Sequence, residues 1–318
     1  MLIAALSRAT GLRLIAVMVL ALIGFVVHLP SLQGEMVWDD SFLVRDNPFI
    51  KSPLFIFEAF RHYLFLDFYS AHYRPVQNLS FIVDYFFWNT NVYGFHLTNL
   101  LLHIASGLLL YLLLEKLFAS WRSVDADDGN SSAWSLGAFF VALLWIVHPV
   151  HSAAVDYISG RADSLAFFFA CAGWLLFIRA RKSTRLVART ALYTLAALSG
   201  LLALCSREIA FVWILLFLLQ LTFFDKGLSR RALIITVLCS LGLLGIYVGL
   251  HTLPDVRVSG APAQGWPGPM RAVLMLRSLG DYARLMIFPG NLHMERTVVA
   301  PENYLSHASE TRGLCGKS

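Results

Sequence analysis

Residues 12–30 read LRLIAVMVLALIGFVVHLP and carry a single formal charge, on Arg13. A helix needs about 20 mostly apolar residues to cross roughly 30 Å of hydrocarbon, so this stretch predicts a membrane span. No small-residue cleavage site follows it, which favours a retained anchor over a signal peptide. Six more stretches of the same kind follow, at 95–118, 133–150, 163–179, 189–206, 208–225 and 231–253. The sequence therefore predicts an all-α, polytopic transmembrane helical bundle.

The composition of the 318-residue chain agrees with this fold class. Hydrophobic residues make up 58% of the chain and charged residues only 14%, whereas a soluble domain carries about 25% charged residues. This excludes a soluble globular enzyme, and the high aromatic content excludes disorder. Cys171, Cys205 and Cys239 lie in or beside apolar stretches, which is typical of buried thiols rather than of a disulfide framework.

The placement of lysine and arginine orients the predicted spans, because cytoplasmic loops are enriched in these residues. With the N-terminus inside, the short inner segments hold about half of the 25 basic residues. This orientation puts 31–94, 148–163 and 254–270 on the outer or luminal face. The net charge of +5 then reflects membrane topology, and no nucleic acid is expected as a partner.

We expect residues 1–300 to form one transmembrane domain of about seven or eight spans, with a long outer loop at 31–94, and residues 301–318 to form a short polar tail. Two apolar but interrupted segments, 75–88 and 271–288, either cross the membrane or lie along it. In the second segment, charged residues fall within about 60° of each other on a helical wheel, which favours an amphipathic helix at the interface. These charges belong to Arg277, Asp281 and Arg284.

Ionisable side chains near membrane depth are costly and usually mark function. The first candidates are Asp39 and Asp40, which follow the first span closely. Adjacent carboxylates can supply a general base or hold a metal ion. Without further context, a solvated turn or a helix cap is the favoured interpretation of the pair, because Asp pairs are common in turns.

The second candidate group is HPVHSAAVDYISGRAD, residues 148–163, between two predicted spans. The spacing of His148 and His151 suits two ligands of one zinc ion. A zinc site needs further ligands, however, and no second HxxH or CxxC motif appears in the sequence. Hydrogen bonding of these histidines at the membrane interface is the alternative. A divalent metal is therefore an open but unsupported cofactor, and no other cofactor is expected.

Arginines at the outer ends of the spans are candidates to bind phosphate. The planar fork of Arg161 suits a phosphate clamp, whereas an ion pair with Asp156 or Asp163 is the competing interpretation. Asp163 is also placed to cap its span. Arg207 and Glu208 lie between the fifth and sixth spans, where Arg207 either binds a ligand or extends to the interface.

Polar residues also occur in and before the second span. Arg74 precedes Pro75 in the outer loop, and His96, Asn99 and His103 follow at i, i+3 and i+7. This spacing puts the last three on one stripe of a helix, which should face the bundle interior rather than lipid. Hydrogen bonding between helices is the favoured role for the stripe.

The order of these motifs resembles the membrane glycosyltransferases of the GT-C class. The nearest similarity is to the transmembrane and tetratricopeptide-repeat O-mannosyltransferases and their bacterial relatives. The matching stretches are VWDD (37–40), YRPV (73–76), FHLTNLLLH (95–103), HPVHSAAVDYISGRAD (148–163), SREIA (206–210) and FPGNL (288–292). The resemblance implies inverting transfer of a sugar, plausibly mannose, from a polyprenyl- or dolichyl-phosphate donor to a protein hydroxyl.

The same resemblance implies a site on the luminal or periplasmic face of the endoplasmic reticulum membrane or the bacterial inner membrane. In this class an acidic residue of the first outer loop acts as general base, a role that falls on Asp39 or Asp40. Cations neutralise the lipid phosphate, and Arg277 and Arg284 are further candidates for this. The predicted donor site comprises Arg74, His148, His151, Arg161, Asp163, Arg207 and Glu208.

Three features depart from the family pattern. Ala153 stands where members usually have Glu, and Arg207 stands where they usually have Lys. No 34-residue helical repeat is found in the sequence, which leaves open a fragment, a truncated non-catalytic relative or a membrane-only enzyme. The alternative from another class is a transporter or flippase of a lipid-linked substrate. Such proteins show inverted repeats and helices broken at the midplane, and we find neither pattern.

Overall fold

The computed structural model describes residues 2–64, 72–121, 131–225, 227–254, 268–290 and 292. Its regular elements are all helical within these residues, which confirms the predicted all-α class. The chain divides into two compact units, Met1–Ser259 and Gly260–Ser318. The long helices of the first unit are α1 (Leu2–His28), α3 (Val92–Trp121), α4 (Ser131–Val147), α6 (Arg161–Lys182), α7 (Leu186–Ser206) and α9 (Arg230–Leu250).

The described residues contain five helices that are long and apolar enough to cross a membrane. A sixth candidate is α4 together with the short helices after it, which follow a bend of 47°. The predicted span 208–225 is different, because its helix α8 (Phe211–Phe223) has only 13 residues. A helix of that length rises about 20 Å, less than the hydrocarbon thickness of roughly 30 Å. Helix α8 is therefore shorter than the span predicted at 208–225.

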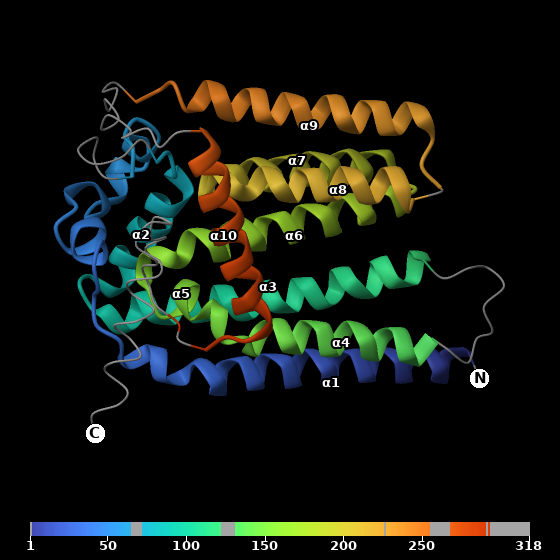
Figure 1. Ribbon diagram of the computed structural model, residues 1–318. Coiled ribbons are helices and arrows are strands. Elements are labelled where there is room, and N and C mark those ends of the chain that lie inside the picture. Colours follow the sequence, from blue (N-terminus) through green and yellow to red (C-terminus); the bar gives the residue numbers. More distant parts are fainter. Residues whose placement is uncertain are drawn as a thin grey trace. The chain divides into compact units, whose positions relative to one another are not determined.

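The short helix α8 nevertheless keeps the alternation of chain direction. Figure 1 shows α3, α6 and α8 running one way and α1, α4, α7 and α9 running the other. The connections 29–91, 148–160 and 207–210 consequently meet at one end of the first unit, which we call the loop-rich end. The described parts of the predicted outer segments 31–94 and 148–163 thus share one end, as the distribution of arginine and lysine requires. The third predicted outer segment, 254–270, lies almost entirely outside the described residues.

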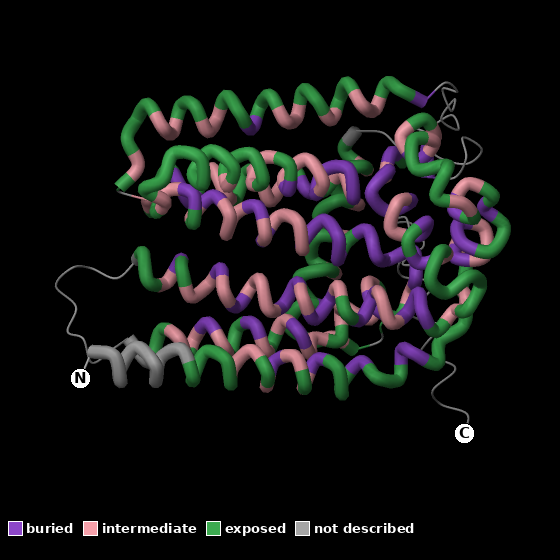
Figure 2. Tube along the Cα trace, turned by 180° about the vertical axis from the view of Figure 1, so that it is seen from behind, coloured by how far each residue is buried: buried purple, intermediate pink, exposed green. Residues whose placement is uncertain are grey.

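The long loop after α1 is folded rather than extended. It contains short helical turns whose starts are capped, because the side chain of Asn47 accepts a hydrogen bond from Phe49 N and that of Ser52 accepts one from Leu54 N. Its apolar side chains form one core with α2 (Pro75–Trp88) and α3. Figure 2 shows buried residues concentrated at the loop-rich end, whereas α9 is exposed along most of its length.

The two interrupted segments form helices that do not qualify as spans. Helix α2 has 14 residues and contains the buried Asp84. Helix α10 (Gly268–Ile287), in the second unit, is strongly amphipathic, as predicted. In α10 the Nε atom of Arg284 lies 3.3 Å from Oδ1 of Asp281, so these charges share one side of the helix.

Cysteine labelling tests the orientation. We expect a cysteine at Phe57, which is exposed at the loop-rich end, to face the outer or luminal side, and a cysteine at Thr184, between α6 and α7, to face the cytoplasm. In a background without Cys239 and Cys315, sealed cytoplasmic-side-out vesicles should react with a membrane-impermeant maleimide at Thr184→Cys immediately. Phe57→Cys should react only after detergent is added. The opposite pattern would reverse the orientation.

Candidate functional site

The two adjacent carboxylates of the first loop have different environments. Trp38 has a φ of 50°, which is unusual for a residue with a side chain and turns the backbone just before the pair. Asp40 is fully buried, whereas Asp39 is only half-buried. Asp39 is therefore the carboxylate of the pair that solvent or a substrate can reach.

Asp40 joins the first loop to the segment before α6. Its Oδ1 atom accepts hydrogen bonds from the hydroxyl of Ser159 (2.6 Å) and from Ser159 N (2.8 Å). Its Oδ2 atom accepts from Val37 N at 3.2 Å and from Ile158 N at 3.4 Å. Burial raises the pKa of Asp40 despite these donors, because a buried carboxylate loses its hydration. The geometry gives Asp40 a positioning role.

The neighbours of the two carboxylates are a phenol and an imidazole. The hydroxyl of Tyr157 hydrogen-bonds to the side chain of Asp39, and burial raises the pKa of this tyrosine. His96 of α3 is fully buried and interacts electrostatically with Asp40 and Asp156. It also interacts with the backbone of Glu35 in the first loop.

Arg161 is directed into the protein and not toward a ligand. Its side chain has no exposed surface, and Nη2 lies 2.5 Å from Oδ2 of Asp84 in α2. Nη2 also donates to Phe95 O at 2.9 Å, and Nε donates to Oδ1 of Asn99 at 2.7 Å. The ring of Phe81 lies 4.8 Å from the guanidinium carbon. A phosphate clamp does not fit this environment, and neither predicted alternative partner, Asp156 or Asp163, is the one observed.

The segment 155–160 is held from several sides. Asn99 donates from Nδ2 to the carbonyl oxygens of Val155, Tyr157 and Ile158 at 2.9 to 3.4 Å. Gln77 of α2 donates to Ser159 O at 2.8 Å. A side chain at Gly160 would meet Ala153 O at 2.1 Å, so this position requires glycine.

The predicted stripe on α3 faces the bundle interior, because His96, Asn99 and His103 are all buried. For Asn99 and His103 the predicted hydrogen bonding between helices is observed. His103 bonds through Nε2 to Ile146 O at 2.9 Å, and His28 bonds to the same oxygen at 3.0 Å. The bend after α4 explains this, because Pro149 interrupts the helical hydrogen bonds near that carbonyl.

His148 and His151 belong to this histidine group rather than to a metal centre. The ring of His151 lies 5.2 Å from that of His103 and 4.4 Å from that of Trp145, and His148 Nδ1 accepts a hydrogen bond from Val150 N. Within the described ranges, no group of three or more His, Cys, Asp or Glu side chains could hold a metal ion. The residues present therefore do not fit the zinc interpretation of the HxxH spacing.

Four of the predicted donor-site residues do come together. Arg74 contacts Oε2 of Glu208 through Nη2 at 3.1 Å and Nε at 3.3 Å, and Arg207 is paired with Asp163. Asp163 also interacts electrostatically with Arg74 and Glu208, so the two ion pairs are neighbours. His72 adds a third contact, with Nδ1 at 3.5 Å from Oε1 of Glu208. We call these five residues the cation cluster.

The carboxylate pair and the cation cluster are connected through the start of α6. Ser159, which binds Asp40, and Asp163, which binds Arg207, are four residues apart on continuous helical turns. A rise of about 1.5 to 2 Å per residue separates them by only about 6 to 8 Å along the axis. The loop-rich end therefore combines an accessible carboxylate with partly exposed arginines.

Sequence reasoning missed several residues of this arrangement. Asp84 had a detectable signal, since it is the only charge in an otherwise apolar helix and its carboxylate would be costly without a partner. Tyr157, Ser159, Gln77 and His28 had no such signal, because polar residues of these types are common at the ends of spans. Their partners are distant in sequence.

Comparison with known proteins shows similarity to named transferases. The chain is 30% identical over 207 residues to the protein O-mannosyl-transferase F38B6.6 of Caenorhabditis elegans, which covers 62% of this chain and 28% of that protein. It is 30% identical over 202 residues to human TMTC2, covering 61% and 22%, and 34% identical over 148 residues to human TMTC1, covering 43% and 15%. Both human proteins are also named protein O-mannosyl-transferases.

These matches confirm the resemblance to the transmembrane and tetratricopeptide-repeat family, with curated relatives at 27–35% identity. The matched part spans less than a third of the length of each of these relatives. No family model matches the chain. No solved structure matches it either.

Proposed function

We propose that this integral membrane protein transfers a mannosyl group from a polyprenyl- or dolichyl-phosphate donor to a hydroxyl group of a protein. The observation that carries the proposal is the similarity to several proteins named O-mannosyl-transferases, which extends over up to 207 residues of the chain. The arrangement of Asp39 beside a buried scaffold, with arginines nearby, supports it. We place this reaction on the outer or luminal face of the membrane.

Asp39 is the proposed general base. The acceptor hydroxyl oxygen attacks the anomeric carbon of the mannosyl phosphate while the bond from that carbon to the phosphate oxygen breaks. The hydroxyl proton passes to the Asp39 carboxylate, and the phosphate leaves with both electrons of the broken bond, attached to its lipid. Attack opposite the leaving group inverts the anomeric carbon. The Tyr157 hydroxyl orients Asp39, and Asp40 holds the first loop against the segment that carries Tyr157.

Arg74 and Arg207 are proposed to neutralise the departing phosphate. Their carboxylate partners, Glu208 and Asp163, hold the two guanidinium groups near each other, and a phosphate suits the planar donors of arginine. Stabilising the charge that develops on a leaving group is a large contribution to catalysis. Arg161, His148 and His151 then act as scaffold, each through contacts inside the protein.

A transfer assay tests the proposal. The full chain in lipid nanodiscs is supplied with labelled dolichyl-phosphate mannose and unfolded secretory-protein substrates, and label in the protein fraction is measured. We expect incorporation above a no-enzyme control, with dolichyl-phosphate glucose giving none. Donor binding without incorporation would contradict catalysis and favour a non-catalytic relative. Movement of the donor lipid across the bilayer without transfer would favour the flippase alternative.

A further inference from the structure

The first unit contains an apolar cavity of about 450 Å³ between α6, α7, α8 and α9. Its volume lies within the range of about 300 to 1,000 Å³ typical of ligand pockets. Small residues of α7 form one wall, namely Ala196, Ala197 and Gly200. Three of the four helices are candidate membrane spans, so the cavity lies at the depth of the hydrocarbon. An occupant of this cavity must therefore come from the bilayer.

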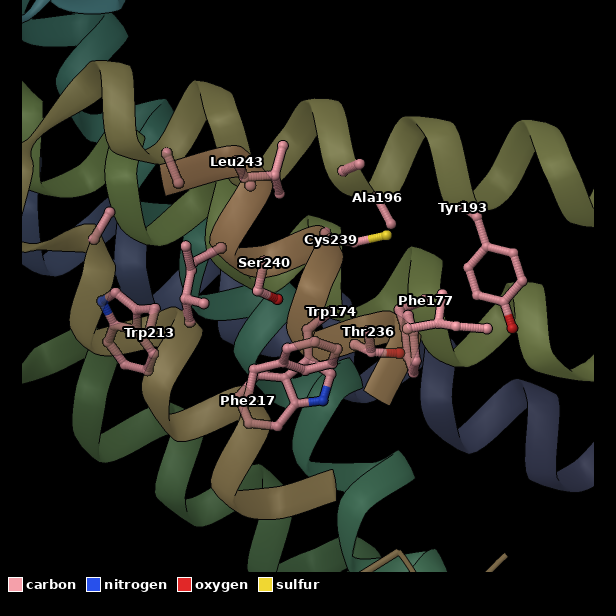
Figure 3. A pocket seen from close by; sticks show the side chains of 18 of the residues that line it. Trp174, Phe177, Tyr193, Ala196, Trp213, Phe217, Thr236, Cys239, Ser240 and Leu243 are labelled. Atoms are coloured by element: carbon pink, nitrogen blue, oxygen red, sulfur yellow. The ribbon is translucent and has the colours of Figure 1, made fainter. Parts of the chain in front are cut away.

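The opposite walls of the cavity are aromatic. Trp174 and Phe177 come from α6, and Trp213 and Phe217 from α8. Figure 3 shows these rings and Ala196 of α7 around the same space, with Tyr193 toward one end. A space between aromatic rings and small apolar side chains suits a hydrocarbon chain.

One end of the cavity adjoins the cation cluster. Ala203 and Ala210 line the cavity, and both are hydrogen-bonded to the backbone of Arg207. Arg207 N donates to Ala203 O at 3.2 Å, and Ala210 N donates to Arg207 O at 3.1 Å. A chain that fills the cavity would thus bring an attached head group to Arg207 and its neighbours.

A buried hydroxyl lies beside the same cluster. Tyr247 of α9 interacts electrostatically with Arg74 and Glu208, and its ring centre lies 6.4 Å from that of Tyr73. Its hydroxyl is buried and has no hydrogen-bond partner among the described residues. Such a group is normally satisfied in a folded protein, and a phosphate oxygen is a suitable acceptor for it.

We propose that the cavity binds the isoprenoid chain of a polyprenyl phosphate, with the phosphate held by Arg74, Arg207 and the hydroxyl of Tyr247. This inference rests on the proposed function for the identity of the lipid. In this proposal, helices α6 to α9 select the lipid by its hydrocarbon chain. The loop-rich end binds the head group of the lipid and carries out the transfer.

The chain-length dependence of the reaction tests this assignment. Ala197→Phe adds a ring to the small wall, and Leu198→Phe adds one at an exposed neighbouring position outside the cavity. We expect Ala197→Phe to raise the KM for a long-chain donor at least tenfold and to leave turnover of a donor with two isoprene units unchanged. Leu198→Phe should match the wild type with both donors. Equal effects of Ala197→Phe on both donors would overturn the assignment.

Photocrosslinking measures binding without turnover. A diazirine-bearing polyprenyl phosphate should label peptides of α6 to α9 in the wild-type protein, with labelling reduced in Ala197→Phe. Unlabelled polyprenyl phosphate should compete, whereas phosphatidic acid and unphosphorylated polyprenol should compete at least tenfold less well. Equal competition by phosphatidic acid would show a cavity for any bilayer chain and overturn the proposal. Labelling without mannosyl transfer would retain the cavity assignment and contradict only the proposed function.

Discussion

Replacing Arg161 with methionine is expected to lower the free energy of unfolding by about 3–5 kcal/mol, the usual cost of breaking a buried ion pair. Asp84 would remain buried with the hydroxyl of Thr98, at 2.8 Å, as its hydrogen-bond donor. Burial already raises the pKa of Asp84 in the presence of the arginine. The loss should appear in unfolding of the detergent-solubilised protein, followed by tryptophan fluorescence.

Two further variants make this prediction specific. Arg45→Met removes an exposed arginine from its pair with Asp46 and should leave the free energy of unfolding close to the wild-type value. The double variant Arg161→Met with Asp84→Leu should recover most of the lost stability, because an apolar pair can replace a buried ionic pair. If Arg161→Met lowers the free energy of unfolding no more than Arg45→Met does, Arg161 is not a structural residue and is again a candidate phosphate ligand.

Asp39→Asn is expected to reduce the turnover number for mannosyl transfer by about 10² to 10⁴, the usual contribution of a general base. The amide keeps the shape of the carboxylate but cannot accept the hydroxyl proton. Donor binding and unfolding should stay near wild-type values, since Asp39 is only half-buried. The transfer assay with dolichyl-phosphate mannose, run beside photocrosslinking, separates the two effects.

Neighbouring acidic residues serve as comparisons. Asp46→Asn changes an exposed carboxylate of the same loop and should keep the wild-type rate. Asp40→Asn should lower both stability and rate, because an amide keeps only one of the two acceptor oxygens, so either Ser159 N or Ile158 N loses its acceptor. A turnover number for Asp39→Asn within threefold of the wild type would remove it from the mechanism. Loss of activity in Asp40→Asn alone, without loss of stability, would transfer the role of base to Asp40.

The structure changes the roles that the sequence predicts for the residues of the HPVH…GRAD block, 148–163. Four of the seven predicted donor-site residues lie in this block, yet Arg161, His148 and His151 make their contacts inside the protein. Only Asp163 of the predicted donor residues in this block reaches the cation cluster. Asn99, Gln77 and Asp40 hold segment 155–160 of the block in place, and the block in turn holds the first loop, which carries the accessible Asp39, through the bonds of Ser159 to Asp40.

Much of the architecture could be predicted because hydropathy is a local property. An apolar stretch such as 12–30 favours a membrane helix whatever it packs against. The numbers of arginine and lysine residues in the loops orient the spans without knowledge of how the helices pack. The short length of helix α8 has a local cause as well. Residues 208–225 are apolar enough for a span, but the turn at Glu208–Ala210 uses up part of the run before the helix begins.

The sequence by itself determined the all-α membrane fold, the end of the bundle where polar residues gather, and the buried stripe on α3. Only the tertiary structure decided which polar side chains meet. Asp40 accepts hydrogen bonds from Ser159, which lies 119 residues later in the chain. Arg161 forms its ion pair with Asp84 and not with either of the two aspartates nearest to it in sequence. A buried charge at bilayer depth is costly unless it is paired. Which residue becomes the partner depends on how the helices pack, and the spacing of residues in the sequence does not indicate that packing.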